Sequence, residues 1–194
     1  MIRLYFSGNS LVRWYFWNRI VKSANIARPR GVVLDGGCGL GLISLFTEGF
    51  YVGLDRTRYL GRVYKALRIL KENVHFVHAD VRYMPFTKMF DGVYAVSVLE
   101  HLDSEEKITR GLKEIGKVIK DNGQLIVGLP TEKWFYRILA SVFRGVYKLK
   151  GRHRFTYSTV IKMIEASGLF KQECTDKIPF LYQVSSWRFI NRRL

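Results

Sequence analysis

The chain has 194 residues, which suffices for one domain with a substantial buried core. Its hydrophobic fraction of 48% is too high for a disordered chain, and no uncharged apolar run of about 18 residues predicts a membrane span. The net charge of +16 favours anionic partners such as nucleic acid, acidic lipid head groups or phosphorylated metabolites, although a merely solubilising surface is the simpler alternative.

Short β-rich runs alternate with helical patterns along the chain, which is typical of an α/β fold with a mostly parallel sheet. The spacing predicts strands at 31–35, 50–55, 74–78, 91–97, 123–129, 168–176 and 180–189. It predicts helices at 10–26, about 40–48, 57–71, 104–120, 132–148 and 156–167. No helix separates the last two strands, so we expect them to pair in antiparallel fashion at the edge of a seven-stranded sheet with helices on both faces. We expect one domain over 1–194, with a helical cap at 1–30 and an inserted substrate-side segment at 131–155.

Basic residues concentrate in three segments of the chain. Residues 1–30 contain six Lys or Arg and no acid, residues 131–162 contain eight and one acid, and residues 188–194 contain three and no acid. Together these segments account for the whole positive excess. The same segments are rich in aromatic residues, a combination that suits either a membrane interface or single-stranded RNA.

Two cysteines, Cys38 and Cys174, lie far apart and lack metal-ligand spacing. They predict a reduced cytoplasmic protein with neither a disulfide framework nor a metal site. Arg13 and Arg19 interrupt the apolar N-terminus, so a secretory signal is not expected.

A glycine-rich stretch follows the first predicted strand and precedes a helix, so its backbone can approach a ligand closely. It reads Asp-Gly-Gly-Cys-Gly-Leu-Gly over residues 35–41. A dinucleotide fingerprint fails on spacing, because counting from Gly37 the third glycine position falls on Leu42. A phosphate-binding P-loop fails because no Gly-Lys-Ser/Thr follows.

This stretch resembles motif I of class I S-adenosylmethionine-dependent methyltransferases, Asp-x-Gly-Cys/Ser-Gly-x-Gly, in the small-molecule and lipid branch (methyltransferase type 11). The resemblance covers about residues 31–130 and implies a Rossmann-like fold. It also implies S-adenosylmethionine as cofactor and S-adenosylhomocysteine as product. An acid before the glycines suits a cationic cofactor, whereas it would repel a pyrophosphate. The motif contributes Asp35, Gly36, Gly37, Cys38, Gly39 and Gly41 to the expected cofactor site.

Three further matches fall at the ends of successive strands, where ligands bind in open α/β sheets. The resemblance implies that Asp55, followed by Arg56, holds the ribose hydroxyls, and that Asp80 takes the adenine amino group with Val81 beside the ring. Ser97 begins the segment Ser-Val-Leu-Glu-His-Leu, which is similar to the segment after strand four in the small-molecule branch.

His101 is the candidate general base, because it lies just past strand four and titrates near neutrality; an orienting role in the loop is the alternative. The segment Gly-Arg-His-Arg-Phe-Thr at 151–156 is similar to a region near the substrate opening of relatives. The candidate substrate-binding residues are Trp14, Trp134, His153, Arg154 and Tyr157. There is no Asn/Asp-Pro-Pro-Tyr/Phe motif after strand four, which lowers the expectation of a base-methylating enzyme.

We therefore expect methyl transfer to a small or lipid-like acceptor, including an anionic one, at or near a membrane. The helical pattern at 10–22, apolar around most of its circumference, favours this hypothesis. An RNA methyltransferase is the rival that net charge favours. A non-catalytic module with a methyltransferase fold is the third alternative.

Overall fold

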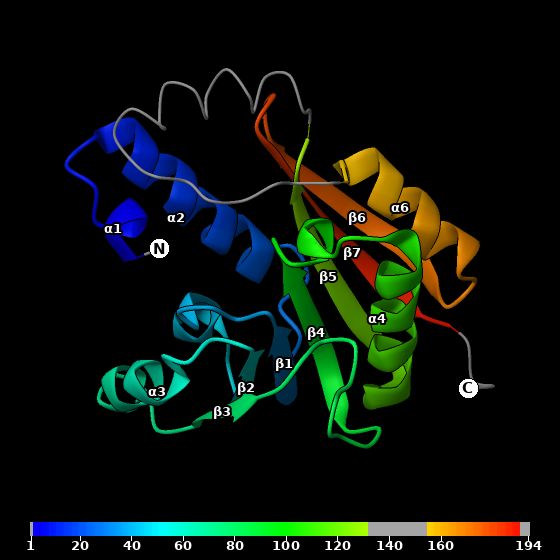
Figure 1. Cartoon of the computed structure of the whole chain (residues 1–194), viewed down its shortest axis with the longest axis horizontal. Coiled ribbons are helices and arrows are strands. Elements are labelled where there is room, and N and C mark those ends of the chain that lie inside the picture. Colours follow the sequence, from blue (N-terminus) through cyan, green and yellow to red (C-terminus); the bar gives the residue numbers. More distant parts are fainter. Residues whose placement is uncertain (1, 132–154, 191–194) are drawn as a thin grey trace.

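Seven strands form one mixed sheet through the middle of the molecule (Figure 1). The computed structural model of the chain describes residues 2–131 and 155–190. The strands are β1 (Val32–Gly36), β2 (Phe50–Asp55), β3 (Val74–His78), β4 (Phe90–Val96), β5 (Ile119–Pro130), β6 (Phe170–Ile178) and β7 (Tyr182–Phe189).

The strand order is β3-β2-β1-β4-β5-β7-β6. The first five strands run parallel, and β7 is antiparallel to both β5 and β6. This confirms the expected fold class, with β7 lying between β5 and the edge strand β6. The order reverses at β1, which pairs with β2 on one side and β4 on the other. Such a switch point opens a crevice at the carboxyl ends of the strands.

Helices cover both faces of the sheet (Figure 1). One face carries α2 with η1 and α3, and the other carries α4 and α6. The helical elements are α1 (Ile2–Tyr5), α2 (Ser10–Asn25), η1 (Leu42–Phe46), α3 (Leu60–Arg68), η2 (Leu99–His101), α4 (Glu105–Val118) and α6 (Tyr157–Ala166).

Neighbouring residues of each central strand enter different cores, because successive strand side chains point to opposite faces. Val33 packs with the α2 and α3 side, whereas Leu34 packs with the α4 and α6 side. Ile126 and Leu125 divide between the two cores in the same way. The uninterrupted apolar runs seen in the sequence are therefore those of strands buried on both faces.

Side-chain caps fix where the helices begin. The Asn9 side chain accepts hydrogen bonds from the backbone N–H groups of Leu11 and Val12 at the start of α2. Ser104 caps α4 in the same way, through the N–H of Lys107. These bonds satisfy donors that the first turn of a helix leaves without an intrahelical partner.

Two expected elements differ in the structure. The helix expected at about 40–48 is the short 3-10 helix η1, because Gly39 and Gly41 have positive φ angles of 53° and 63°. Backbone in that region cannot continue a right-handed helix, so helical structure starts only at Leu42. The strand expected at 123–129 starts at Ile119 instead, directly after α4. The helix expected at 132–148 lies outside the described residues.

Candidate functional site

The glycine turn after β1 lies at the switch point and packs tightly against its neighbours. Gly37 and Cys38 donate backbone hydrogen bonds to the Leu54 carbonyl, over 2.7 and 3.1 Å. Gly37 has φ +79°, and a Cβ atom there would overlap the side chain of Val98. At Gly41, a Cβ atom would lie 2.7 Å from the ring of Phe76. The turn therefore needs glycine at these positions for both conformation and space.

Asp55 joins the end of β2 to this turn. Its Oδ2 accepts a 2.8 Å hydrogen bond from the Gly39 N–H, and its Oδ1 accepts a 2.8 Å bond from the Thr57 N–H. A carboxylate oxygen can accept two hydrogen bonds, so each oxygen retains one acceptor position. Gly39, Asp55 and Thr57 all line a pocket of about 590 Å³. The carboxylate is thus held rigidly and can accept further bonds from a ligand with two hydroxyl groups.

Asp80 belongs to an ion cluster beyond the end of β3. Its carboxylate accepts three hydrogen bonds from Arg82, and Oδ2 lies 3.4 Å from the Arg56 guanidinium. The hydrogen bonds from Arg82 hold the pKa of Asp80 below its usual value. Val81 is buried, and its Cγ1 would lie 3.4 Å from a Cβ atom at Gly36. The acid expected at the adenine is therefore largely engaged by Arg82, with one acceptor position left.

Asp35 is buried beneath the glycine turn. Its Oδ2 accepts a 2.6 Å hydrogen bond from the Tyr51 hydroxyl. Burial raises the pKa of Asp35 to about 7; the Tyr51 hydrogen bond acts in the opposite direction, and the Asp55 charge raises it further. A cation bound at this edge of the sheet would stabilise the ionised form. Cys38 is also buried, and burial raises the pKa of its thiol well above the ordinary value, which disfavours the nucleophilic thiolate.

An arginine from α2 reaches the end of β4. The Arg19 guanidinium donates to the Oγ of Ser97, which is also 2.9 Å from the Tyr182 hydroxyl. Its Cζ lies 4.8, 5.1 and 5.6 Å from the ring centroids of Tyr182, Phe16 and Tyr15. Among the described residues no carboxylate pairs with Arg19 within 4.0 Å, and its buried Nε has no hydrogen-bond partner.

Ser97 itself has φ +56°, a left-handed conformation that is uncommon outside glycine. The strain is maintained by a hydrogen bond from its N–H to the Gly128 carbonyl, 2.7 Å away. Strained residues of this kind concentrate at functional sites. The end of β4 is therefore a second fixed point of the site, next to the glycine turn that packs on Val98.

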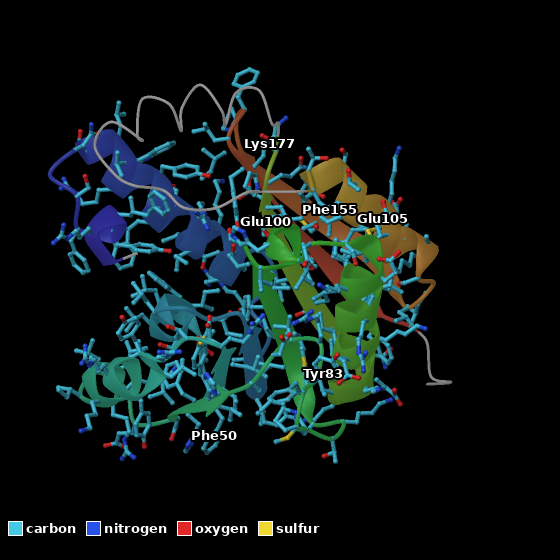
Figure 2. The ribbon with its side chains drawn as sticks, viewed as in Figure 1. Phe50, Tyr83, Glu100, Glu105, Phe155 and Lys177 are labelled. Atoms are coloured by element: carbon cyan, nitrogen blue, oxygen red, sulfur yellow. The ribbon has the colours of Figure 1, made fainter. Side chains whose placement is uncertain are left out.

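Glu100 and His101 lie on η2, just after β4; Figure 2 shows Glu100 at the opposite end of the sheet from Phe50, which starts β2. Glu100 is fully buried, and burial raises the pKa of its carboxyl to about 8 against the effect of the Arg19 charge. His101 is exposed, yet partial desolvation and the Arg19 charge lower the pKa of its imidazole. The lowered pKa favours the neutral ring, the form that can accept a proton.

The candidate substrate residues lie in different environments. Trp14 is half exposed on α2, whereas Tyr157, the first residue of α6, is buried in the core. Trp134, His153 and Arg154 lie outside the described residues. Sequence analysis missed Arg19 as a site residue; residues 10–22 contain three cations, Arg13, Arg19 and Lys22, and their pattern does not single out Arg19.

Residues 2–131 and 155–190 contain neither a candidate metal site nor a helix that could span a membrane. No group of three His, Cys, Asp or Glu in this part of the chain could hold a metal ion. No helix in it has the length and apolar character needed to cross a bilayer.

Residues 34–127 match the family described as "Methyltransferase domain". The chain is 31% identical over 104 residues to (S)-coclaurine N-methyltransferase of Papaver somniferum, and 24% identical over 120 residues to tRNA (carboxymethyluridine(34)-5-O)-methyltransferase of Arabidopsis thaliana. These matches cover 49% and 61% of this chain but only 28% of each relative.

The fold is similar to that of N-methyltransferase NodS from Bradyrhizobium japonicum WM9, solved in complex with S-adenosylhomocysteine. The TM-score is 0.69 at 13% identity, and the superposition covers 94% of this chain and 89% of NodS. At this identity the likeness establishes a shared Rossmann-like architecture.

The raised pKa of Asp35 makes stability depend on pH. Asp35 binds its proton more tightly in the folded state than in the unfolded state. Its contribution to the free energy of unfolding is therefore complete below the pKa that Asp35 has in the unfolded state, and it is lost as pH rises to about 7. Asp35→Asn removes it. We expect the free energy of unfolding of the wild type, relative to Asp35→Asn, to fall between pH 4.5 and 7.5, by up to about 4 kcal/mol.

Urea denaturation across this pH range measures the difference. Glu100, whose raised pKa acts in the same direction, is present in both proteins and cancels. Asp121→Asn, on the surface beside Lys88, is the matched control. A difference between wild type and Asp35→Asn that stays constant with pH would show that Asp35 is ionised throughout.

Proposed function

Residues 34–127 of this chain are a methyltransferase domain, and from that premise we propose that the protein transfers a methyl group from S-adenosylmethionine to a small or lipid-like acceptor. The observation that carries the proposal is the Asp55 carboxylate, fixed by the Gly39 N–H at the switch point of the sheet with acceptor positions to spare. A glycine turn and a rigid diol acceptor at this place suit an adenosine cofactor.

The charged groups near the glycine turn match the chemistry of S-adenosylmethionine. Its ribose hydroxyls can donate to the two free acceptor positions of Asp55. Its ammonium and sulfonium carry positive charge, and Asp35 lies under the turn with a carboxyl that such a charge would ionise. Asp80 retains one acceptor position for an adenine amino group, beside Val81.

The glycine turn, Asp35, Asp55 and Asp80 offer no cation to the carboxylate of the cofactor. Arg19 supplies this cation. A desolvated guanidinium without a paired anion is costly, unless an anion binds there. The Nε without a partner among the described residues and the neighbouring Ser97 Oγ offer donors at the end of β4. Guanidinium and carboxylate pair through two parallel hydrogen bonds, so Arg suits this role better than Lys.

The bound cofactor supplies an activated methyl group on a positively charged sulfur, and the leaving group needs no protonation. The protein mainly has to bind, orient and exclude water, which positioning at a rigid sheet edge achieves. A proton must be removed only from an acceptor that carries one. His101 on η2, where the lowered pKa favours the neutral ring, is the residue proposed to accept it.

A small or lipid-like acceptor fits the apolar surroundings of the site. Tyr15, Phe16 and Tyr182 are buried around Arg19 and make the environment next to Ser97 apolar. The coclaurine N-methyltransferase to which the chain is similar acts, by its name, on a small molecule. We propose in addition that the protein is cytoplasmic and contacts a membrane peripherally.

An RNA methyltransferase is the second candidate. It is favoured by the net charge of +16 and by the similarity to the Arabidopsis tRNA methyltransferase. A non-catalytic binding module is the third, and the intact Asp35, glycine turn and Asp55 speak against it.

The cofactor part of the proposal is tested by calorimetry with S-adenosylmethionine. Asp55→Ala removes the acceptor of the ribose hydroxyls, and we expect the dissociation constant to rise at least about 100-fold, since hydrogen bonds to a charged group are strong. Asp55→Asn should lose less, because its amide oxygen still accepts. Asp121→Ala, an exposed acid paired with Lys88, should bind as the wild type does. Equal binding by Asp55→Ala would remove the ribose assignment.

Arg19→Met tests the carboxylate assignment with two ligands. We expect the variant to bind S-adenosylmethionine about 10- to 100-fold more weakly, yet to bind decarboxylated S-adenosylmethionine as the wild type does. Arg13→Met, an exposed position on the same helix, serves as control. Equal losses for both ligands would mean that Arg19 supports the fold rather than the carboxylate.

The acceptor class is tested by transfer of a radiolabelled methyl group. A crude lipid and small-molecule extract and total RNA from the same cells are incubated separately with the protein, with Asp55→Ala as background. We expect the label to enter the lipid and small-molecule extract. Label in RNA would favour the second candidate, and label in neither the third.

A further inference from the structure

The segment around α3 is strongly basic, although the part of the chain outside the three basic segments has no net charge. Residues 56–71 contain six Lys or Arg and no acid. Arg58, Arg62, Lys65 and Arg68 are all exposed. Spacings of three and four residues place these cations on neighbouring rows of the helix, so they form one positive surface.

Large apolar side chains lie exposed among these cations. Ile69 and Leu70, which follow α3, are 84% and 69% exposed, and Tyr59, which precedes it, is 63% exposed. Single exposed apolar residues are common, but several close together beside a positive surface mark an interaction site. Arg62 lies over the Tyr59 ring, 5.6 Å from its centroid, so charge and apolar surface are interleaved.

A pocket joins this surface to the N-terminal helices. The pocket of about 590 Å³ is lined by Phe6 next to α1 and by Tyr59, Arg62 and Ala66 of the α3 region. Phe6 is 68% exposed, and its ring lies 6.4 Å from Trp17 of α2. In Figure 1, α1 and α3 lie on the same side of the molecule. We call Phe6, Arg58, Tyr59, Arg62, Lys65, Ile69 and Leu70 the α1–α3 face.

We infer that the α1–α3 face docks on an anionic lipid bilayer, with its cations at the lipid head groups and Phe6, Tyr59, Ile69 and Leu70 entering the interface. The charge of the face complements acidic head groups, and long Arg and Lys side chains keep their charges in water while apolar neighbours insert. The inference rests on the proposed function only for the need to reach a lipid-like acceptor.

The side chains favour a bilayer over RNA. Single-stranded RNA is bound by aromatic rings on which bases stack, together with cations for the phosphates. Ile69 and Leu70 are the most exposed apolar residues of the face, and their aliphatic side chains offer no stacking surface. Transfer of exposed aliphatic groups from water into hydrocarbon lowers their free energy.

Docking on this face would bring the cofactor end of the site to the bilayer. Gly39 and Asp55 line the same pocket as Phe6 and Tyr59. The carboxyl edge of β1 and β2 is therefore separated from the α1–α3 face by a single pocket. This placement brings the bilayer close to the edge of the sheet at which the cofactor is proposed to bind.

The test is flotation of the full chain with vesicles of phosphatidylcholine alone or with about one-third phosphatidylserine, at low ionic strength. We expect binding only to the anionic vesicles, and a decrease as salt rises. The triple variant Arg58→Gln, Arg62→Gln and Lys65→Gln should bind about 100-fold more weakly, since each surface cation contributes about fivefold. The triple variant Lys113→Gln, Lys162→Gln and Lys171→Gln changes net charge equally on exposed positions elsewhere and should bind as the wild type does.

The apolar part is tested with Ile69→Ser and Leu70→Ser together, against Met89→Ser and Ile190→Ser together as control. All four positions are exposed, so neither pair should shift the melting temperature much. Three outcomes would each overturn the inference. They are wild type that fails to float, equal losses in the two charge variants, and retention of unfractionated tRNA that depends on α3 while vesicles are not bound. Calorimetry with S-adenosylmethionine on the same preparations distinguishes this failure from failure of the proposed function.

Discussion

The hydrogen bond from the Gly39 N–H to the Asp55 carboxylate fixes the glycine turn to the end of β2. Because Gly37 also donates to Leu54, the turn is held against β2 at two points and against β4 by its packing on Val98. The turn then presents backbone at the switch point, where any side chain would fill the space. The geometry of the proposed cofactor site depends on this attachment.

Buried ionisable groups gather at the same edge of the sheet. Asp35, Glu100 and Arg19 are all removed from water to a large extent, and burial raises the pKa values of both acids. Desolvated charges destabilise a fold unless they are paired or used. Their concentration beside a strained Ser97 therefore supports a site that was selected for binding charge rather than for stability.

Much of the fold could be predicted from local pattern, because β-rich runs and turn residues are local signals. The strand at 50–55 agrees with the expected bounds, and the glycine motif gave the position of the turn. Arg19 could not be assigned in this way, since its partners Ser97 and Tyr182 are distant in the chain and meet only in the folded sheet. The basic α3 segment is not apparent from the net charge of longer stretches, because acids elsewhere in those stretches offset its six cations.

The position of β7 has a consequence for how the polypeptide acquires its structure during synthesis. Among the described strands, β6 pairs only with β7, and β7 is also the second neighbour of β5 beside β4. Residues 170–178 leave the ribosome before residues 182–189, so β6 has no partner from β7, and β5 keeps an open edge, until residues 182–189 have emerged. Open edges invite pairing with other chains, so this interval is the stage at which the nascent protein most needs chaperone protection.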